Sequence, residues 1–540
     1  MNIVPLFLVG YATLLFGYKF LKKSVTSNFH PDDNNQTPAV ELNDNKDFVP
    51  TRKGVLFGHH FMSIAGTSPI IASIVGLIWG WGPALLWMIF GVLLIGGVHD
   101  YYSLMLSVRH KGKSMGEVAK EEIGPWSGKM VSIVLAFGGI LVYAIFLSII
   151  ASTLEKMPTA VLPTLALIPI AMLCGVMLKK GVSLLITTIV GISLTVVCVW
   201  YGISTPIEAS KDFWSLFFLG YTFIAIYVPV WILLQPRDYL NFSILSIGLV
   251  IGFIGLIIGA PTIKMPFFHD FFSEIRGPLW PMLFVTISCG AASGWHALIN
   301  SGTTSKQIKK ESHAFPIAYG GMIGETVMAV LSASFVISAF SYADFSSKEL
   351  TSGVISQLFS EGLGNAMAHL GIPVIVGVTA GALALSALTL TTLDSFARTS
   401  RYVVQELGHK TFLKGNFASS IFVAVVGFFL YYQVPFIELW NGLVLGGLML
   451  LIIPFTILFV SHKGEKNFSY YIHIIFPLLF LIPTTVAGLV YLGYKYVMES
   501  KFISLGLIIF LAILLIVMIK EVVKKYNNNK EKLKPAEQSS

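Results

Sequence analysis

The sequence predicts an all-α polytopic membrane protein with about fifteen transmembrane helices. The first observation is composition: 55% of the 540 residues are hydrophobic and 12% are charged, whereas soluble domains carry about 25% charged residues. The second is that the apolar residues form runs of roughly 18–25, the length that crosses a hydrocarbon layer of ~30 Å. The third is that Lys and Arg collect in alternate connections between these runs, as they do in cytoplasmic loops. A single water-soluble core does not account for this chain.

Each predicted span is an apolar run bounded by polar or charged residues. The spans cover residues 3–21, 54–79, 82–107, 128–154, 161–178, 183–202, 213–233, 242–261, 279–301, 315–341, 372–396, 416–433, 436–459, 470–495 and 503–522.

The distribution of basic residues sets the predicted orientation. With the N-terminus outside and the sides alternating, 29 of the 36 Lys and Arg residues fall on the inner side and 7 on the outer side. This asymmetry predicts a multi-pass protein of a bacterial-type plasma membrane, with its C-terminus in the cytoplasm. The formal net charge of +8 is then an orientation signal and not a nucleic-acid footprint.

Four regions are predicted along the chain. Residues 1–53 form an N-terminal helix and a cytoplasmic loop, whose polar part at 24–51 is expected to be mobile. Residues 54–396 form a transporter core, 397–525 add further transmembrane helices, and 526–540 form a disordered tail. No soluble domain is expected. The three cysteines lie singly in apolar runs, which favours packing roles over a disulfide or a metal site.

Helix-breaking residues interrupt three of the spans. The second contains Gly66-Thr67-Ser68-Pro69, the seventh Tyr227-Val228-Pro229, and the ninth a glycine-rich stretch at 290–294 that includes Ser293. Broken helices near the midplane are typical of secondary-transporter binding sites. A lone Pro in a span favours a harmless kink, but Gly-Thr-Ser-Pro favours a site. We therefore expect Gly66, Thr67, Ser68, Pro69 and Ser293 to bind the substrate.

Ionisable residues gather at one depth in three spans. His59 and His60, His99 with Asp100, and His296 all lie roughly 8–11 Å from the inner ends of their spans. Such residues are costly in a membrane and are usually functional. A shared cluster fits a proton site or polar gate, and the alternatives are structural hydrogen bonding and a Zn²⁺ site.

Two acidic residues complete the predicted set. Glu325 lies near the middle of the tenth span, where a carboxylate fits proton or substrate chemistry. Asp394 ends the eleventh span and is spaced i, i+4 from Arg398, so the two can pair on one helical face. A helix-end ion pair and a gating role are both open for Asp394.

Several sequence blocks resemble the carbon starvation protein A family. They occur in the family's order over about residues 50–410, and they are Arg52-Lys53-Gly54-Val55-Leu56-Phe57-Gly58-His59-His60-Phe61 with Ile64 to Ile70, His99-Asp100 with Ser107 to Glu117, Pro236-Arg237-Asp238-Tyr239-Leu240, Ser293-Gly294-Trp295-His296 with Ser301 to Lys306 and Tyr319 to Glu325, and Leu393-Asp394 with Arg398, Arg401 and Tyr402.

The resemblance implies peptide uptake under nutrient limitation, and some members of the family are similar to pyruvate:proton symporters. It also implies a LeuT-like core of two inverted five-helix repeats. In that arrangement the second span opens the first repeat, the seventh opens the second, and the ninth, with Ser293, is the eighth core helix.

The function predicted from these observations is a secondary active importer of a small carboxylate-bearing solute and not an enzyme. A short peptide is the first candidate and pyruvate, in symport with protons, is the alternative. H⁺ is the expected coupling ion, Na⁺ is a second possibility, and no cofactor, resident metal or nucleic acid is expected. His59, His60, Asp100, His296, Glu325 and Asp394 are assigned to coupling or gating. A channel, a metal-dependent membrane enzyme and a nutrient sensor are the other classes, and no oligomeric state is predicted.

Overall fold

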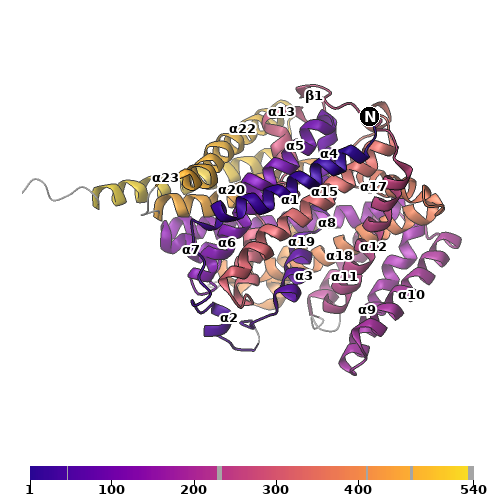
Figure 1. Cartoon of the computed structure of the whole chain (residues 1–540), viewed down its shortest axis with the longest axis horizontal. Helices are drawn as coiled ribbons and strands as arrows, with labels where there is room; N and C mark the ends of the chain where they lie inside the picture. Colours follow the sequence, from indigo (N-terminus) through magenta and orange to yellow (C-terminus); the bar gives the residue numbers. More distant parts are fainter. Residues whose placement is uncertain (46, 228–233, 409–410, 462–465, 533–540) are drawn as a thin grey trace, which may run out of the picture.

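A computed structural model describes residues 1–45, 47–227, 234–408, 411–461 and 466–532 as a bundle of long helices (Figure 1). Twelve described helices are long and apolar enough to cross a membrane, and a bent pair brings the number to 13. The all-α polytopic class is therefore confirmed, but the count of about fifteen spans is not.

Within the described residues, the first half of the chain contains twelve α-helices, some of them joined by single 3₁₀ or π turns. They are α1 (Val4–Thr26), α2 (Pro38–Glu41), α3 (Lys53–Ile64), α4 (Ser68–Gly76), α5 (Trp81–Gly91), α6 (Gly97–Arg109), α7 (Met115–Glu122), α8 (Pro125–Lys156), α9 (Val161–Lys179), α10 (Leu184–Ser204), α11 (Lys211–Tyr227) and α12 (Leu234–Gly259).

The second half begins with a two-stranded antiparallel hairpin, β1 (Phe272–Ser273) and β2 (Gly277–Pro278), in which Phe272 faces Pro278. The helices that follow are α13 (Leu279–Thr286), α14 (His296–Gly302), α15 (Gly320–Ala339), α16 (Tyr342–Ser346), α17 (Ser352–Ala368), α18 (Val374–Leu407), α19 (Asn416–Gln433), α20 (Phe436–Ser461), α21 (Phe468–Tyr470), α22 (Phe476–Met498) and α23 (Phe502–Lys532).

Two predicted spans account for the difference in count. The seventh corresponds to α11, which has 17 residues and ends where the described residues stop. The ninth is divided into α13 and α14 by the irregular residues 287–295. α17 was not among the predicted spans, because its serines and glycines lower its hydropathy. Those serines face α8, where Ser352 Oγ lies 3.0 Å from Ser148 Oγ and Ser356 Oγ lies 2.9 Å from Thr153 Oγ1.

Two sets of helices follow the same order along the chain. The first set has a broken helix (α3 and α4), a helix with a π turn at Val92–Gly96 (α5 and α6), the short α7 and the long α8. The second set has a broken helix (α13 and α14), a helix that starts with a π turn at Phe315–Tyr319 (α15), the short α16 with α17, and the long α18. The long helices α8 and α18 pack against each other along the centre of the bundle.

The described residues show a second broken helix in the ninth span. The assignment of the seventh span as the start of the second repeat stays a prediction. Val228 and Pro229 of the seventh span lie outside the described residues.

The two ends of the bundle are distinct. At one end, called here the hairpin face, β1 and β2 lie near the chain start, where Ile3 N donates to Pro261 O over 3.1 Å (Figure 1). At the other end, called the strap face, residues 27–45 and 47–52 form a segment that we call the strap. Thr37 Oγ1 donates to Ile308 O over 2.6 Å and Thr51 N donates to Gln307 O over 2.9 Å. The strap, expected to be mobile, is held by these bonds.

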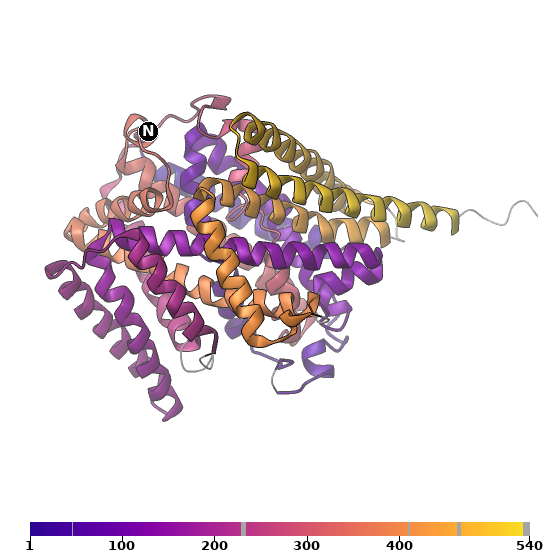
Figure 2. The same cartoon turned by 180° about the vertical axis from the view of Figure 1, so that it is seen from behind.

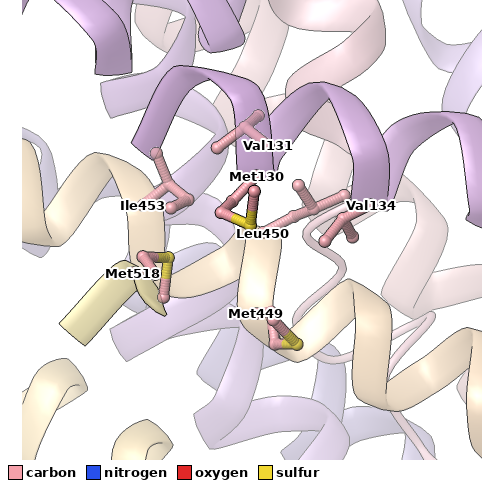
Figure 3. A pocket seen from close by; sticks show the side chains of 7 residues that line it. All are labelled: Met130, Val131, Val134, Met449, Leu450, Ile453 and Met518. Carbon is pink, nitrogen blue, oxygen red and sulfur yellow. The ribbon is translucent and has the colours of Figure 1, made fainter. Parts of the chain in front are cut away.

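Two helix pairs lie at opposite edges of the bundle. The α9–α10 hairpin lies at one edge and the α22–α23 pair at the other (Figures 1 and 2). α23 continues to Lys532, into the tail that was predicted to be disordered. Where α8, α20 and α23 meet, a cavity of about 10 Å³ is lined by seven apolar side chains, among them Met130, Met449 and Met518 (Figure 3). A cavity of this size with no polar lining is a packing void and not a binding site.

Candidate functional site

The first break in a spanning helix lies at residues 65–67. α3 ends at Ile64 and α4 begins at Ser68, and the two axes are bent by 53°. Pro69 lies in the first turn of α4, where its missing N–H costs no helical hydrogen bond. The predicted Gly-Thr-Ser-Pro motif therefore interrupts the helix as expected. Ala65 N still donates to Phe61 O over 2.8 Å, but Gly66 N donates to Ile64 O over 3.0 Å, which is not a helical partner.

The second break lies at residues 287–295 and touches the first. Gly290 has φ +86°, a left-handed conformation that side chains rarely adopt, and a Cβ added there would lie 3.6 Å from Pro69 Cβ. The Gly290 N–H donates to Glu325 Oε1 over 3.2 Å, and its carbonyl accepts from Thr326 Oγ1 over 2.8 Å. α15 thus holds the unwound segment through both backbone groups of one glycine.

Small hydroxyl and thiol groups surround this contact. Cys289 Sγ lies 3.7 Å from Ser293 Oγ, and the hydroxyls of Ser68 and Ser288 also lie beside it. The structure therefore brings together four predicted substrate residues of the first break, Gly66 to Pro69, and Ser293 of the second. Cys289 was not singled out from the sequence, because a lone cysteine in an apolar run is usually a packing residue.

A fully buried acid–histidine cluster adjoins the second break. His296, the first residue of α14, places Nδ1 2.8 Å from Asp100 Oδ2 and Nε2 3.2 Å from Glu325 Oε2. Asp100 Oδ1 lies 2.9 Å from His99 Nδ1. One imidazole thus bridges carboxylates from α6 and α15, as the predicted shared cluster requires. Within the described part of the chain, no group of three or more His, Cys, Asp or Glu has the arrangement to hold a metal ion.

His60 and His59 separate from each other. His60 is buried, and its Nδ1 lies 2.9 Å from Thr304 Oγ1. A Cβ on Gly321 of α15 would lie 2.9 Å from His60 Cδ2, so this ring lines the same helix as Glu325, one turn away. The side chain of His59 is exposed. The depth of these residues in their span predicted a buried site for both, and only His60 is buried. Neighbouring side chains in a helix point 100° apart, so they do not share one face.

Asp394 lies in a second buried cluster. Its Oδ2 lies 2.7 Å from Arg237 Nη1 of α12 and accepts from Tyr221 OH of α11 over 2.9 Å. Asn241 of α12 donates to Thr391 Oγ1 over 2.9 Å. Arg398, the partner expected from i, i+4 spacing, donates to Ala225 O. The motif Pro236-Arg237-Asp238-Tyr239-Leu240 thus supplies the cation that Asp394 pairs with.

The first break, between α3 and α4, contacts α18. Thr67 Oγ1 lies 3.0 Å from Thr389 Oγ1. A Cβ on Gly66 would lie 2.9 Å from Thr392 Oγ1 and 3.8 Å from Phe146 of α8. Gly66 and Thr67 thus face α8 and α18, whereas the acid–histidine cluster lies among α6, α14 and α15.

Comparison with known sequences identifies the family. The model of the carbon starvation protein CstA family matches residues 2–356. The chain belongs to the CstA family. The last of the resembling blocks, at 393–402, lies beyond the matched range.

Named CstA relatives are bacterial. The chain is 35% identical over 353 residues to the peptide transporter CstA of Campylobacter jejuni, covering 61% of this chain and 50% of that protein. It is 36% identical over 327 residues to the pyruvate/proton symporter BtsT of Escherichia coli, covering 56% and 45%. The chain thus spans about half the length of the curated relatives it matches. Both relatives are named as transporters, which is the class of protein expected for this CstA-family chain.

A solved structure supports the fold class. A manganese transporter of Eremococcus coleocola, crystallised with an aromatic bis-isothiourea compound, matches with a TM-score of 0.51 and 11% identity, over 90% of this chain and 99% of that one. At this identity the likeness concerns the fold alone. It confirms the LeuT-like class expected for the CstA-family chain.

Proposed function

We propose that this CstA-family chain is a secondary active transporter that imports small peptides across the bacterial plasma membrane, with protons as the coupling ion. The hairpin face is outside and the strap face and C-terminus are cytoplasmic, in agreement with the distribution of Lys and Arg. The observation that carries the proposal is the contact between two unwound segments beside a buried acid–histidine cluster, at Gly290. The family membership supports the same conclusion.

Substrate binding uses the backbone of the two breaks. Interrupted helices present free N–H and C=O groups, and the start of α4 directs the positive end of its dipole toward residues 65–67. A solute carboxylate accepts hydrogen bonds there, from the backbone and from the Thr67 and Ser68 hydroxyls. Ser293 contributes a further hydroxyl from the second break.

Proton coupling uses the cluster around His296. A proton on this imidazole is stabilised by Asp100 and Glu325, which lie on different helices. Transfer of the proton to Glu325 removes the charge attraction between α14 and α15 and weakens the hydrogen bond from the Gly290 N–H, because a neutral carboxyl oxygen accepts less strongly than a carboxylate. Proton transfer and the shape of the binding site are thereby linked through one glycine.

Pyruvate symport is the second candidate. The similarity to the pyruvate/proton symporter BtsT supports it, and pyruvate presents the same carboxylate to the break as a peptide C-terminus does. Na⁺ is the alternative coupling ion, because hydroxyl and carbonyl oxygens of the breaks also suit this cation.

The test is a counterflow and uptake panel in proteoliposomes with pyruvate, dipeptides and tripeptides, run with and without a proton or a sodium gradient. We expect peptide uptake that rises with an inward proton gradient. Uptake that ignores the proton gradient would refute the coupling. Unchanged uptake in a variant with both Thr67→Ala and Ser68→Ala would refute the binding site.

A further inference from the structure

Arg276 is a buried cation with only neutral partners. It lies in the turn between β1 and β2 and is 2% exposed. Its Nη1 donates to Asn441 Oδ1 over 3.4 Å, its Nη2 donates to Thr286 Oγ1 over 3.2 Å, and its Nε has no hydrogen-bond partner. Among the described residues no carboxylate forms an ion pair with it.

The acidic residues nearby are engaged elsewhere. Glu438, one turn before Asn441 on α20, lies 2.7 Å from Lys501 Nζ and accepts from Ser504 Oγ. Glu499 lies 2.6 Å from the same lysine. Asn441 itself donates to Tyr496 OH over 3.0 Å. The positive charge of Arg276 is therefore not balanced by its own surroundings, which is a costly arrangement for a guanidinium removed from water.

The position of the guanidinium points to the solute. Its partner Thr286 is the last residue of α13, and the unwound segment starts at the next residue. The other partner, Asn441, lies five residues after the start of α20, about 8 Å from the hairpin face. Arg276 thus lies between the hairpin face and the second break.

We propose that Arg276 recognises the carboxylate of the solute on its way from the hairpin face to the break at Gly66. The planar guanidinium offers two parallel N–H groups to a carboxylate, and the unpaired Nε is available for one of them. The solute supplies the missing counter-charge, and a molecule without a free carboxylate leaves the cation unpaired. Arg276 is therefore the residue that selects carboxylates over amides. This inference rests on the proposed transport function.

Two kinds of variant test this role of Arg276, one at Arg276 itself and one at its partner Asn441, so that the test does not depend on the folding of a single variant. Arg276→Gln removes the positive charge, and Arg276→Lys keeps the charge but lacks the two parallel N–H groups of the guanidinium. Asn441→Asp keeps the shape of the Asn441 side chain but places a carboxylate beside Nη1 of Arg276. The protein itself then supplies the counter-charge of the guanidinium. If Arg276 served only to fix the hairpin, Asn441→Asp would strengthen that contact and leave solute selectivity unchanged. Arg52→Gln, at an exposed arginine on the strap face, is the control.

The readout is the half-saturation concentration for uptake of a dipeptide, its C-terminal amide and pyruvate in proteoliposomes. The wild-type protein and Arg52→Gln are expected to prefer the free acid. In Arg276→Gln and Asn441→Asp the half-saturation concentration of the free acid should rise about 10- to 100-fold, the loss of one charge-assisted contact, while that of the amide stays constant. For Arg276→Lys, the half-saturation concentration of the free acid should lie between those of the wild-type protein and Arg276→Gln.

The outcomes separate the two proposals. Wild-type protein that takes up none of the solutes overturns the transport function and this inference with it. Wild-type uptake that makes no distinction between acid and amide, or an acid-to-amide ratio in Asn441→Asp equal to that of the wild type, overturns the role of Arg276 alone. Thermal unfolding of each purified variant shows that the ratio is measured on folded protein.

Discussion

Replacing Gly290 by Ala tests whether the junction of the two breaks controls transport. The added methyl group meets two obstacles: φ of +86°, and Ala329 Cβ at 2.7 Å. The left-handed conformation costs about 1–2 kcal/mol for a residue with a Cβ, and overpacking adds about 1–3 kcal/mol. Because the nearest atom belongs to the rigid α15, the strain is relieved by moving the segment away from Glu325.

This movement lengthens the hydrogen bond from Gly290 N to Glu325. Strain of about 2 kcal/mol in one of two conformations shifts their equilibrium roughly 30-fold. We therefore expect Gly290→Ala to lower the initial rate of solute uptake in proteoliposomes at least about tenfold and to lower the thermal unfolding temperature of the purified protein.

The matched control is Gly302→Ala at the other end of the same broken helix. Gly302 has no heavy atom within 4 Å of its added Cβ and no positive φ. It should keep wild-type uptake and unfolding temperature. The reasoning is refuted if Gly290→Ala and Gly302→Ala behave alike in both assays, because the close approach would then carry no constraint.

Four further predictions follow from other contacts. Asp100→Asn removes a counter-charge of His296, so stimulation of uptake by a proton gradient should disappear while counterflow persists; stimulation of wild-type size would contradict this. Asp394→Asn leaves Arg237 buried without its counter-ion and should destabilise the protein by about 3–5 kcal/mol, which adding Arg237→Gln should partly reverse in thermal unfolding. Cysteines at Thr67 and Thr389, whose hydroxyls lie 3.0 Å apart, should crosslink under oxidation and block uptake until reduced, whereas either single cysteine should not. At the strap, the backbone N–H of Ser312 lowers the pKa of the Asp33 carboxyl below its usual value, so the ionised carboxylate stabilises this contact. Hydrogen-exchange protection of the Ser312 amide should therefore hold at about pH 5, fall as the pH drops below the usual Asp range, and lose this dependence in Asp33→Asn.

The sequence predicted features that depend on local composition. Long apolar runs predicted the spanning helices, and Gly66-Thr67-Ser68-Pro69 predicted the first break, because Pro and Gly act on the backbone within a few residues. The depth of Asp100 and His296 in their spans predicted that they would meet, since depth is nearly fixed by position along a straight helix.

Features that depend on which helices are neighbours could not be predicted in this way. Asp394 was matched with Arg398 by helical spacing, but its ion pair with Arg237, some 157 residues away and on another helix, could not be predicted in this way. Arg276 was counted as an ordinary loop residue of the outer side, because only the tertiary structure shows that its hairpin folds onto Thr286 and Asn441. α17 escaped detection because its serines are paired with those of α8 and not exposed to lipid.

The placement of the two polar clusters bears on how such a bundle could change shape. The Asp100–His296–Glu325 cluster links α6, α14 and α15, and the Arg237–Asp394–Tyr221 cluster links α11, α12 and α18. Each cluster therefore holds one group of helices together, since separating buried charges from their partners is costly. Where the first break crosses from one group to the other, the contact is a hydroxyl pair, Thr67 with Thr389, beside Gly66 packed on Phe146 and Thr392. A neutral hydroxyl pair can exchange its partner for water or for a solute at little net cost. Relative motion is thus expected between the two groups and not within them, and the solute site proposed at Gly66 to Ser68 lies on the boundary where that motion would open and close it.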